Sequence, residues 1–107
     1  MKSMVEIRHH LHQNPELSDN EMKTAKYLKQ ILQDFAAQEI VENLGGHGLM
    51  AIYRGQRAGK NLLLRADLDA LPIAENSALL YKSRQPQVAH LCGHDGHMTI
   101  LLEVARR

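Results

Sequence analysis

An apolar run that ends in two carboxylates, NLLLRADLDALP at residues 61–72, says most about the fold class. Its three consecutive leucines, Leu62–Leu64, show no alternation with polar residues. A strand with one solvent-facing side alternates, whereas a strand covered by helices on both faces does not. We therefore predict a buried strand over residues 61–66, within the mixed sheet of an α/β fold.

Two amphipathic helices are predicted on the N-terminal side of this strand. Each begins at a serine followed three residues later by a glutamate, which is the spacing of a capping box. These pairs are Ser3 with Glu6 and Ser18 with Glu21. Apolar residues then recur at helical spacing, which predicts helices over residues 3–13 and 19–36.

The rest of the chain is predicted to alternate between strands, loops and one more helix. The predicted elements are short strands over residues 39–42 and 49–53, a hairpin connection over residues 54–60 and a loop over residues 74–90. From Gly96 the pattern becomes helical again and is apolar over most of the circumference. We expect this last helix to be buried in the domain.

Composition and charge exclude several classes of protein. Of 107 residues, 44% are hydrophobic and 23% are charged, which is typical of a globular domain and not of a disordered chain. Thirteen basic residues nearly balance twelve acidic ones, so we predict no surface for nucleic acid or anionic lipid. No apolar stretch is long enough for a membrane span. The N-terminus lacks a signal peptide and Cys92 is the only cysteine, which predicts a cytoplasmic protein.

The densest group of chemically competent side chains is HLCGHDGH at residues 90–97. Cys92 and His94 would point the same way in an extended segment, and thiolate and imidazole bind zinc, nickel, cobalt or manganese. Asp95 and His97 could orient these ligands. The alternative is a buried cysteine among unrelated loop histidines, because two ligands do not complete a metal site.

A second group, Asp67 and Asp69, follows the predicted strand. Open α/β sheets bind ligands at the carboxyl ends of their strands, so these carboxylates could support a metal site. Alternatively, Asp67 pairs with Arg65 and Asp69 begins a turn. Both interpretations remain open from the residues alone.

The remaining histidines carry weaker signals. His9 and His12 share one face of the first predicted helix, where a metal pair is geometrically possible but a solvated surface is the simpler interpretation. His47 lies among glycines without a partner in the sequence. The sequence contains no nucleophile elbow, phosphate-binding loop or dinucleotide fingerprint.

Three segments together resemble the amidohydrolase branch of the aminoacylase-type zinc metallopeptidases. That family includes hippurate hydrolases, IAA–amino acid hydrolases and N-acyl-L-amino acid amidohydrolases. The segments are LHQNPEL at residues 11–17, LRADLDALPI at residues 64–73 and HLCGHDGH at residues 90–97. They follow the order of the family's motifs and span most of the chain.

The resemblance implies a metal-dependent amidohydrolase that cleaves the amide bond of N-acyl amino acids through a metal-activated water. It also implies a partial three-layer α/β/α zinc-peptidase-like domain and two divalent ions, which could be zinc, manganese, nickel or cobalt. Cys92 and His94 match metal ligands of the family, and the thiolate is expected to bridge both ions. Asp69 matches an active-site carboxylate. Positions with expected supporting roles are His12, Glu16 and Asp95.

Other parts of the family pattern have no counterpart in residues 1–107. These are a pair of glutamates that includes the general base, later histidine ligands and a dimerisation domain. We therefore expect residues 1–107 to be the N-terminal part of the catalytic domain, inactive alone, and to form a homo-oligomer or associate with the missing part. The rival interpretation is a truncated, non-catalytic module for metal binding or association.

Overall fold

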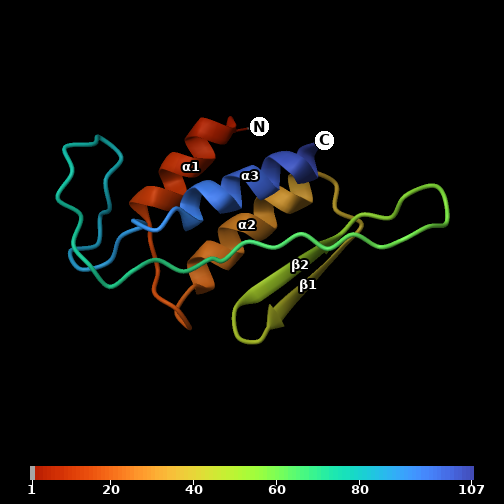
Figure 1. The fold of residues 1–107 in the computed structure, drawn as a ribbon, viewed down its shortest axis with the longest axis horizontal. Coiled ribbons are helices and arrows are strands. Elements are labelled where there is room, and N and C mark those ends of the chain that lie inside the picture. Colours follow the sequence, from red (N-terminus) through yellow and green to blue (C-terminus); the bar gives the residue numbers. More distant parts are fainter. Residues whose placement is uncertain (1) are drawn as a thin grey trace.

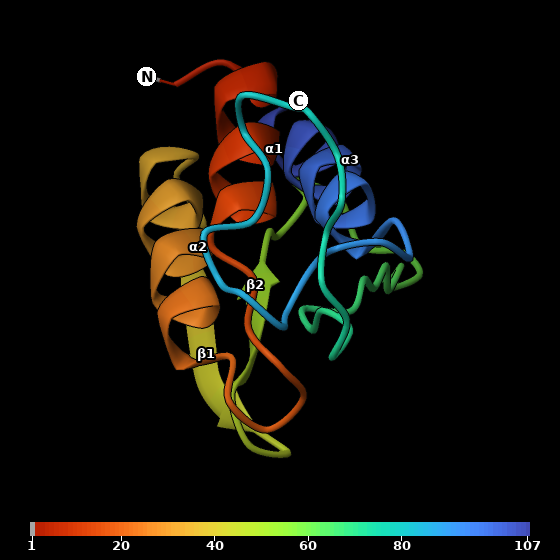
Figure 2. The ribbon, with the colours of Figure 1, turned by 90° about the vertical axis from the view of Figure 1, so that its left-hand side faces the viewer.

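Three helices and a two-stranded sheet make up the regular structure of residues 2–107. The computed structural model describes residues 2–107. Its elements are, in order, α1 (Met4–Gln13), α2 (Met22–Asp34), β1 (Glu39–Leu44), β2 (Gly48–Ile52) and α3 (His94–Arg106). α3 packs on α1, while α2 packs on β2, so that the sheet lies on one side of the helices (Figures 1 and 2). This arrangement is part of an α/β fold, as predicted.

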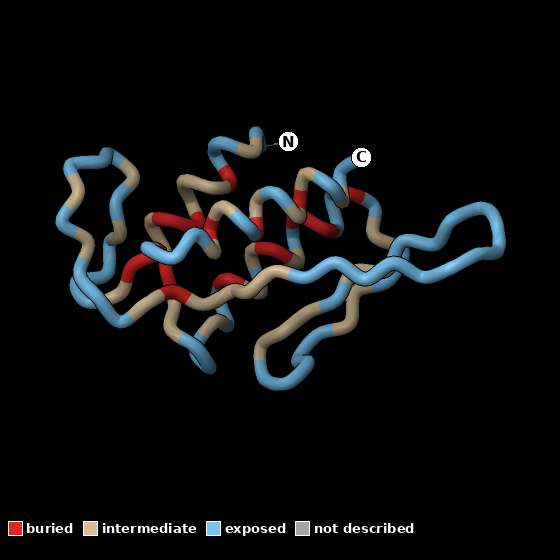
Figure 3. The backbone as a smooth tube through the Cα atoms, viewed as in Figure 1, coloured by how far each residue is buried: buried red, intermediate tan, exposed pale blue. Residues whose placement is uncertain are grey.

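The hydrophobic core lies where the three helices meet. Figure 3 shows the buried residues gathered on the facing sides of the helices. The core side chains are Ile7 and Leu11 from α1, Leu28, Ile31, Leu32 and Phe35 from α2 and its C-terminal end, and Met98 and Leu102 from α3. Burial of such side chains stabilises a fold by about 1.5–3 kcal/mol each. This cluster therefore brings the three helices together.

The start of α1 follows the sequence prediction. The Ser3 hydroxyl accepts a hydrogen bond from the Glu6 backbone N–H at 3.1 Å, and the Glu6 carboxylate accepts one from the Ser3 N–H at 3.4 Å. This reciprocal pair is the predicted capping box. α1 ends at Gln13, where the Asn14-Pro15 pair excludes further helix.

The start of α2 differs from the prediction, because the helix begins at Met22 and not at residue 19. Asp19 has a φ of 68°, a left-handed conformation that a right-handed helix cannot contain. No side chain at the N-cap bonds the first turn. Instead Glu16 caps the helix from upstream: its carboxylate accepts hydrogen bonds from the Thr24 N–H at 2.6 Å and the Thr24 hydroxyl at 2.7 Å. The predicted Ser18–Glu21 capping box was wrong.

The two predicted short strands are confirmed, but they pair with each other. β1 and β2 form an antiparallel hairpin in which Glu39 faces Ile52 and Val41 faces Met50. The turn contains Gly45 and Gly46, both with positive φ. Glycine adopts this conformation without steric penalty.

The predicted strand over residues 61–66 is not formed within the described residues. Leu62 and Leu63 are 85% and 78% exposed, and residues 61–66 form no backbone hydrogen bonds with the rest of residues 2–107. Because a strand requires a neighbour for its N–H and C=O groups, this segment stays irregular on its way to Asp67 (Figure 1). The predicted hairpin connection over residues 54–60 was therefore also wrong.

The last helix is confirmed, although it begins at His94 and is buried on one face only. Met98 and Leu102 point into the core, whereas Ile100 and Val104 are exposed. Burial over most of the circumference is therefore not observed in the part of the chain that the structure describes. None of the helices within residues 2–107 has the length and apolarity that a membrane crossing requires.

The cap supplied by Glu16 can be tested by mutation. We expect Glu16→Ala to lower the free energy of unfolding by about 1 kcal/mol, because the substitution leaves the first N–H groups of α2 without an acceptor. Urea unfolding followed by circular dichroism measures the change. Ser18→Ala is the matched control and should be nearly neutral. A loss in Ser18→Ala together with a nearly neutral Glu16→Ala would show that the cap lies at Ser18 instead.

Candidate functional site

His94 and the segment around Asp69 form the centre of the candidate site. His94 is the first residue of α3, preceded by Gly93 in a left-handed conformation with φ 92°. Its Nδ1 lies 2.9 Å from the backbone carbonyl oxygen of Asp69 and 3.2 Å from the Asp69 carboxylate. A carbonyl oxygen can only accept, so Nδ1 carries the hydrogen. In the neutral ring, Nε2 then keeps a lone pair that can bind a metal ion.

Asp67 lies on the other side of the same imidazole. One of its carboxylate oxygens is 3.7 Å from His94 Nε2, and the other forms an ion pair with Arg65. Both interpretations of the sequence therefore hold in part: Asp67 pairs with Arg65 and still reaches the candidate site. Its negative charge lies beside the nitrogen that is free to bind a cation.

The Asp69 segment is held by backbone hydrogen bonds on both sides. The N–H of Ala70 donates to the Glu16 carbonyl at 2.8 Å. Leu71 and Ala89 exchange two hydrogen bonds, at 2.9 and 3.0 Å, in an isolated antiparallel bridge. The position of Asp69 relative to α3 is thus fixed by the path of the main chain.

Cys92 lies just outside this arrangement. The cysteine is free and exposed. Because the chain bends at Gly93, Cys92 and His94 do not lie on one extended segment, contrary to the prediction. His97 is exposed, with its ring 6.0 Å from that of His94 between centroids. Within residues 2–107 no three histidine, cysteine or acidic side chains converge as a metal site.

Asp95 points away from His94 and into a buried network. Its carboxylate accepts a hydrogen bond from His12 Nδ1 at 2.8 Å and lies 3.4 Å from Arg8 Nε. His12 Nε2 in turn lies 3.0 Å from both oxygens of Glu75. His12 is only 4% exposed, so its interpretation as part of a solvated helix face was wrong. Asp95 therefore connects α3 with α1.

The network shifts the pKa of both His12 and Glu75. Burial alone would lower the pKa of His12, but hydrogen bonds to Glu75 and Asp95 outweigh it and raise that pKa. Burial would raise the pKa of Glu75, whereas the bonds from His12, the Ser77 hydroxyl and the Ser83 N–H lower it to about 2. The contact between a cation and a carboxylate favours the charged forms of His12 and Glu75.

Sequence reasoning missed Glu75 and Tyr81, both in the loop predicted over residues 74–90. Tyr81 stacks on His9 with ring centroids 3.7 Å apart and meets His12 edge-on. A lone carboxylate and a lone tyrosine in a polar loop carry no periodic signal. The position of Glu75 shortly after the strand-end motif was the only clue.

His90 is buried near this network without a hydrogen-bond partner. It is 3% exposed, and neither ring nitrogen is bonded to another group among residues 2–107. Burial lowers the pKa of His90, which favours the neutral ring.

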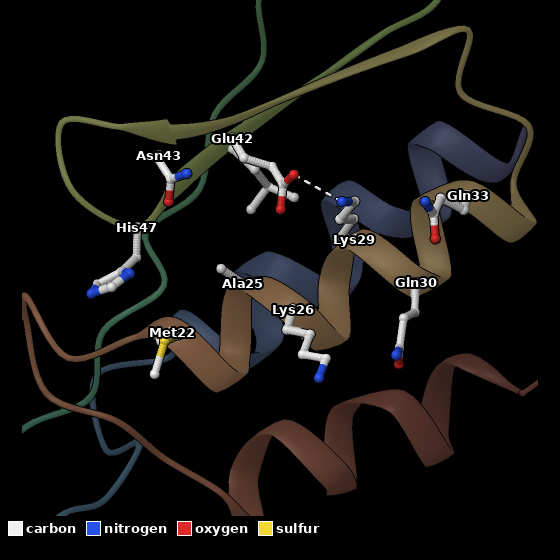
Figure 4. Close-up of a pocket in the computed structure, with 10 residues that line it drawn as sticks. Met22, Ala25, Lys26, Lys29, Gln30, Gln33, Glu42, Asn43 and His47 are labelled. Carbon is white, nitrogen blue, oxygen red and sulfur yellow. Dashed lines mark hydrogen bonds and ion pairs between the residues drawn. The ribbon is translucent and has the colours of Figure 1, made fainter.

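A pocket elsewhere on the surface does not involve these residues. It lies between α2 and the β1–β2 hairpin, has a volume of ≈ 400 Å³ and is crossed by the ion pair of Lys29 with Glu42 at 2.8 Å (Figure 4). Its lining includes none of the candidate ligands. This pocket is therefore separate from the candidate site at the N-terminal end of α3.

Comparison with known proteins bears out the resemblance seen in the sequence. No family profile matches the chain. It is 45% identical to the hippurate hydrolase of Campylobacter jejuni, over 94% of this chain and 26% of that protein. It is 43% identical to the N-acyl-L-amino acid amidohydrolase of Geobacillus stearothermophilus, over 96% of this chain and 28% of the relative. The chain is homologous to the aminoacylase-type amidohydrolases.

Two solved structures share the fold of this chain. A dinuclear metal-binding peptidase of the M20 family from Bacillus subtilis superposes with a TM-score of 0.90 at 34% identity, over 96% of this chain and 29% of that one. A protein from methicillin-resistant Staphylococcus aureus, described as an aminohydrolase, also gives 0.90, at 42% identity over 96% and 27% of the two chains. The chain thus spans between a quarter and a third of the length of these relatives.

The buried network predicts how stability depends on pH. We expect Glu75→Gln to lower the free energy of unfolding by about 3 kcal/mol near pH 6, because it removes one partner of a buried ion pair. The difference from wild type should shrink as pH falls from 4.5 toward the folded pKa of about 2, where Glu75 itself becomes protonated. It should also shrink as pH rises above 6.5, through the raised pKa of His12, where the imidazolium is lost.

Urea unfolding at a series of pH values measures this profile. Glu42→Gln removes one partner of an exposed pair and is the control, with an expected loss below about 1 kcal/mol at every pH. A loss for Glu75→Gln that does not vary between pH 3 and pH 9 would contradict the ionic network.

Proposed function

We propose that this chain forms part of a metal-dependent amidohydrolase that cleaves the amide bond of N-acyl amino acids. The observation that carries the proposal is the identity of 43–45% to a hippurate hydrolase and an N-acyl-L-amino acid amidohydrolase, along nearly the whole chain. The names of both relatives describe hydrolysis of an amide between an acyl group and an amino acid. The substrate class of the present protein follows from theirs.

The proposed ligands are Cys92 and His94. The donor set fits a transition-metal ion, because imidazole and thiolate suit zinc, nickel, cobalt and manganese. The hydrogen bond from His94 Nδ1 to the Asp69 carbonyl also leaves Nε2 available, which is the usual arrangement of a metal-binding histidine. The free, exposed thiol of Cys92 has no competing partner in a disulfide.

Two bound ions would supply Lewis-acid activation of water and of the amide carbonyl. The residues of this chain have the task of holding that centre. Asp69 keeps the Nδ1 hydrogen of His94 in place, and Asp67 adds negative charge beside Nε2. His97, one turn further along α3, is close enough to His94 to orient a ligand or a bound water.

The compartment and the partners that we propose follow from the free cysteine, the substrate class and the net charge. A single free cysteine that serves as a ligand requires a reducing compartment, so we place the protein in the cytoplasm. Its partner is the N-acyl amino acid, and the balanced charge offers no surface for nucleic acid or anionic lipid.

A second function, association without catalysis, is favoured by one observation. Leu62 and Leu63 are adjacent and are 85% and 78% exposed, and neighbouring exposed apolar side chains occur on surfaces that bind another protein or a second copy. Under this alternative the chain is a binding module that holds one metal ion or none. Homo-oligomerisation of the isolated chain would fit either function, so the deciding test must measure chemistry.

Metal binding tests the assignment of the ligands. We expect the chain to bind Co²⁺ weakly, with a thiolate-to-cobalt absorption band, because two protein ligands hold an ion less tightly than a complete site. Cys92→Ser should abolish the band, and His94→Ala should lower the affinity at least about tenfold. His47→Ala, in the β1–β2 turn, is the control and should behave as wild type. Equal uptake by all four proteins would remove Cys92 and His94 from the site.

A chimera tests the proposed reaction. The chain should replace the matched region of the Campylobacter jejuni hippurate hydrolase and support hydrolysis of hippurate, whereas the chain alone should show no enzymatic turnover. In the chimera, Cys92→Ser should lower kcat by at least about a hundredfold, because the ions that activate water would be lost. A folded, metal-loaded but inactive chimera, together with a self-associating isolated chain, would favour the non-catalytic alternative.

A further inference from the structure

His12 connects three separate segments of the fold through one buried ring. The ring lies on α1, its Nδ1 contacts Asp95 in the first turn of α3, and its Nε2 contacts Glu75 in the loop that follows the Asp69 segment. The side chains of Glu75 and Asp95 are 3% and 2% exposed. Solvent therefore contributes little to this contact, and the imidazole alone bridges the two carboxylates.

With both carboxylates ionised, this geometry places an imidazolium at His12. An ionised carboxylate only accepts hydrogen bonds, so both ring nitrogens must donate and both must carry hydrogens. Arg8, 3.4 Å from Asp95, supplies a second positive charge, so that two anions and two cations balance. Removing the imidazolium would leave net negative charge in the interior, which is strongly destabilising locally.

The two segments that His12 joins also carry the candidate site. Asp95 directly follows His94, and the strand-like stretch from Asp69 to Leu71 leads within four residues to Glu75. The 2.9 Å bond between His94 Nδ1 and the Asp69 carbonyl exists only if both segments keep their relative position. A displacement of about 1 Å is enough to spoil the geometry of such a site.

We propose that His12 is a positioning residue, which holds the Asp69 segment against the first turn of α3 and thereby fixes the orientation of the His94 imidazole. This proposal rests on the proposed function in one respect: the proposed function assigns a metal ion to His94. The clamp itself is a property of the metal-free chain. It assigns to α1 a part in the site, although no α1 side chain reaches a candidate ligand directly.

His9 provides a matched comparison on the same helix. Its ring stacks on Tyr81 of the same loop at 3.7 Å, and it has no hydrogen bond to Asp95 or Glu75. His9→Ala therefore removes a histidine contact to the loop without touching the bridge between the carboxylates. An effect specific to His12 cannot then be attributed to loop packing in general.

The experiment uses the full 107-residue chain and two readouts. The first is the ¹H–¹⁵N signal of the His94 ring, recorded without metal, which reports the bond to the Asp69 carbonyl. The second is the Co²⁺ affinity. In His12→Ala we expect the Nδ1–H signal of His94 to be lost through exchange with water, and the Co²⁺ affinity to fall about tenfold. His9→Ala should retain both, and added imidazole, which fits the vacated space, should restore both in His12→Ala.

The outcomes separate the two proposals. If Cys92→Ser and His94→Ala leave metal uptake unchanged, the proposed ligands are wrong, and the metal-free His94 signal still decides the role of His12. An unaltered His94 signal in folded His12→Ala overturns the positioning role. Where His12→Ala does not fold, His12→Gln, which is uncharged and can donate to only one carboxylate, is measured instead with the same expected loss. If both variants are unfolded and added imidazole does not restore their fold, the positioning role is also overturned. His12 would then support the whole fold and not only the contact between His94 and Asp69.

Discussion

Two buried carboxylates that share one imidazolium constrain the structure more than any single apolar contact. Asp95 and Glu75 come from segments twenty residues apart, and each would be unstable in the interior without a positive partner. His12 satisfies both because α1 presents it between the loop and α3. The core cluster around Ile7 and Leu11 brings the helices together without fixing their rotation or the path of the loop. The directional bonds of His12 supply that precision.

Local patterns in the sequence predicted the local structure well. The capping box at Ser3 depends on residues three apart, and α1 forms as predicted. Short strands over residues 39–42 and 49–53 were also found, since alternation and glycine placement act over a few residues. Where the prediction was wrong, a non-local interaction was responsible. Glu16 competes with Ser18 for the first turn of α2 from outside the helix, and nothing in the helix pattern itself reveals that competitor.

The failed strand over residues 61–66 has a related cause. Three consecutive leucines are typical of a strand that is buried on both faces. A strand also needs neighbouring strands that bond its backbone N–H and C=O groups, and residues 2–107 provide no such neighbour for this segment. The relatives that match the chain are about four times as long. The leucine pattern indicates the environment that these residues suit, which is a buried strand with neighbours on both sides. Residues 2–107 supply only part of that environment. The outer face of α3 is a second example, because Ile100 and Val104 are suited to burial but are exposed in residues 2–107.

The candidate site shows how much of a functional geometry can reside in the main chain. The sequence motifs singled out His94 and Asp69, and the resemblance attributed the expected role of Asp69 to its carboxylate. In the structure the shorter contact to His94 comes from the backbone carbonyl of Asp69, at 2.9 Å against 3.2 Å. A carbonyl oxygen has no alternative protonation state, so it fixes the tautomer of His94 at any pH at which the ring is neutral. The path of the chain through Asp69, set by the bridge to Ala89 and by the clamp at His12, therefore determines which nitrogen of His94 is free to bind.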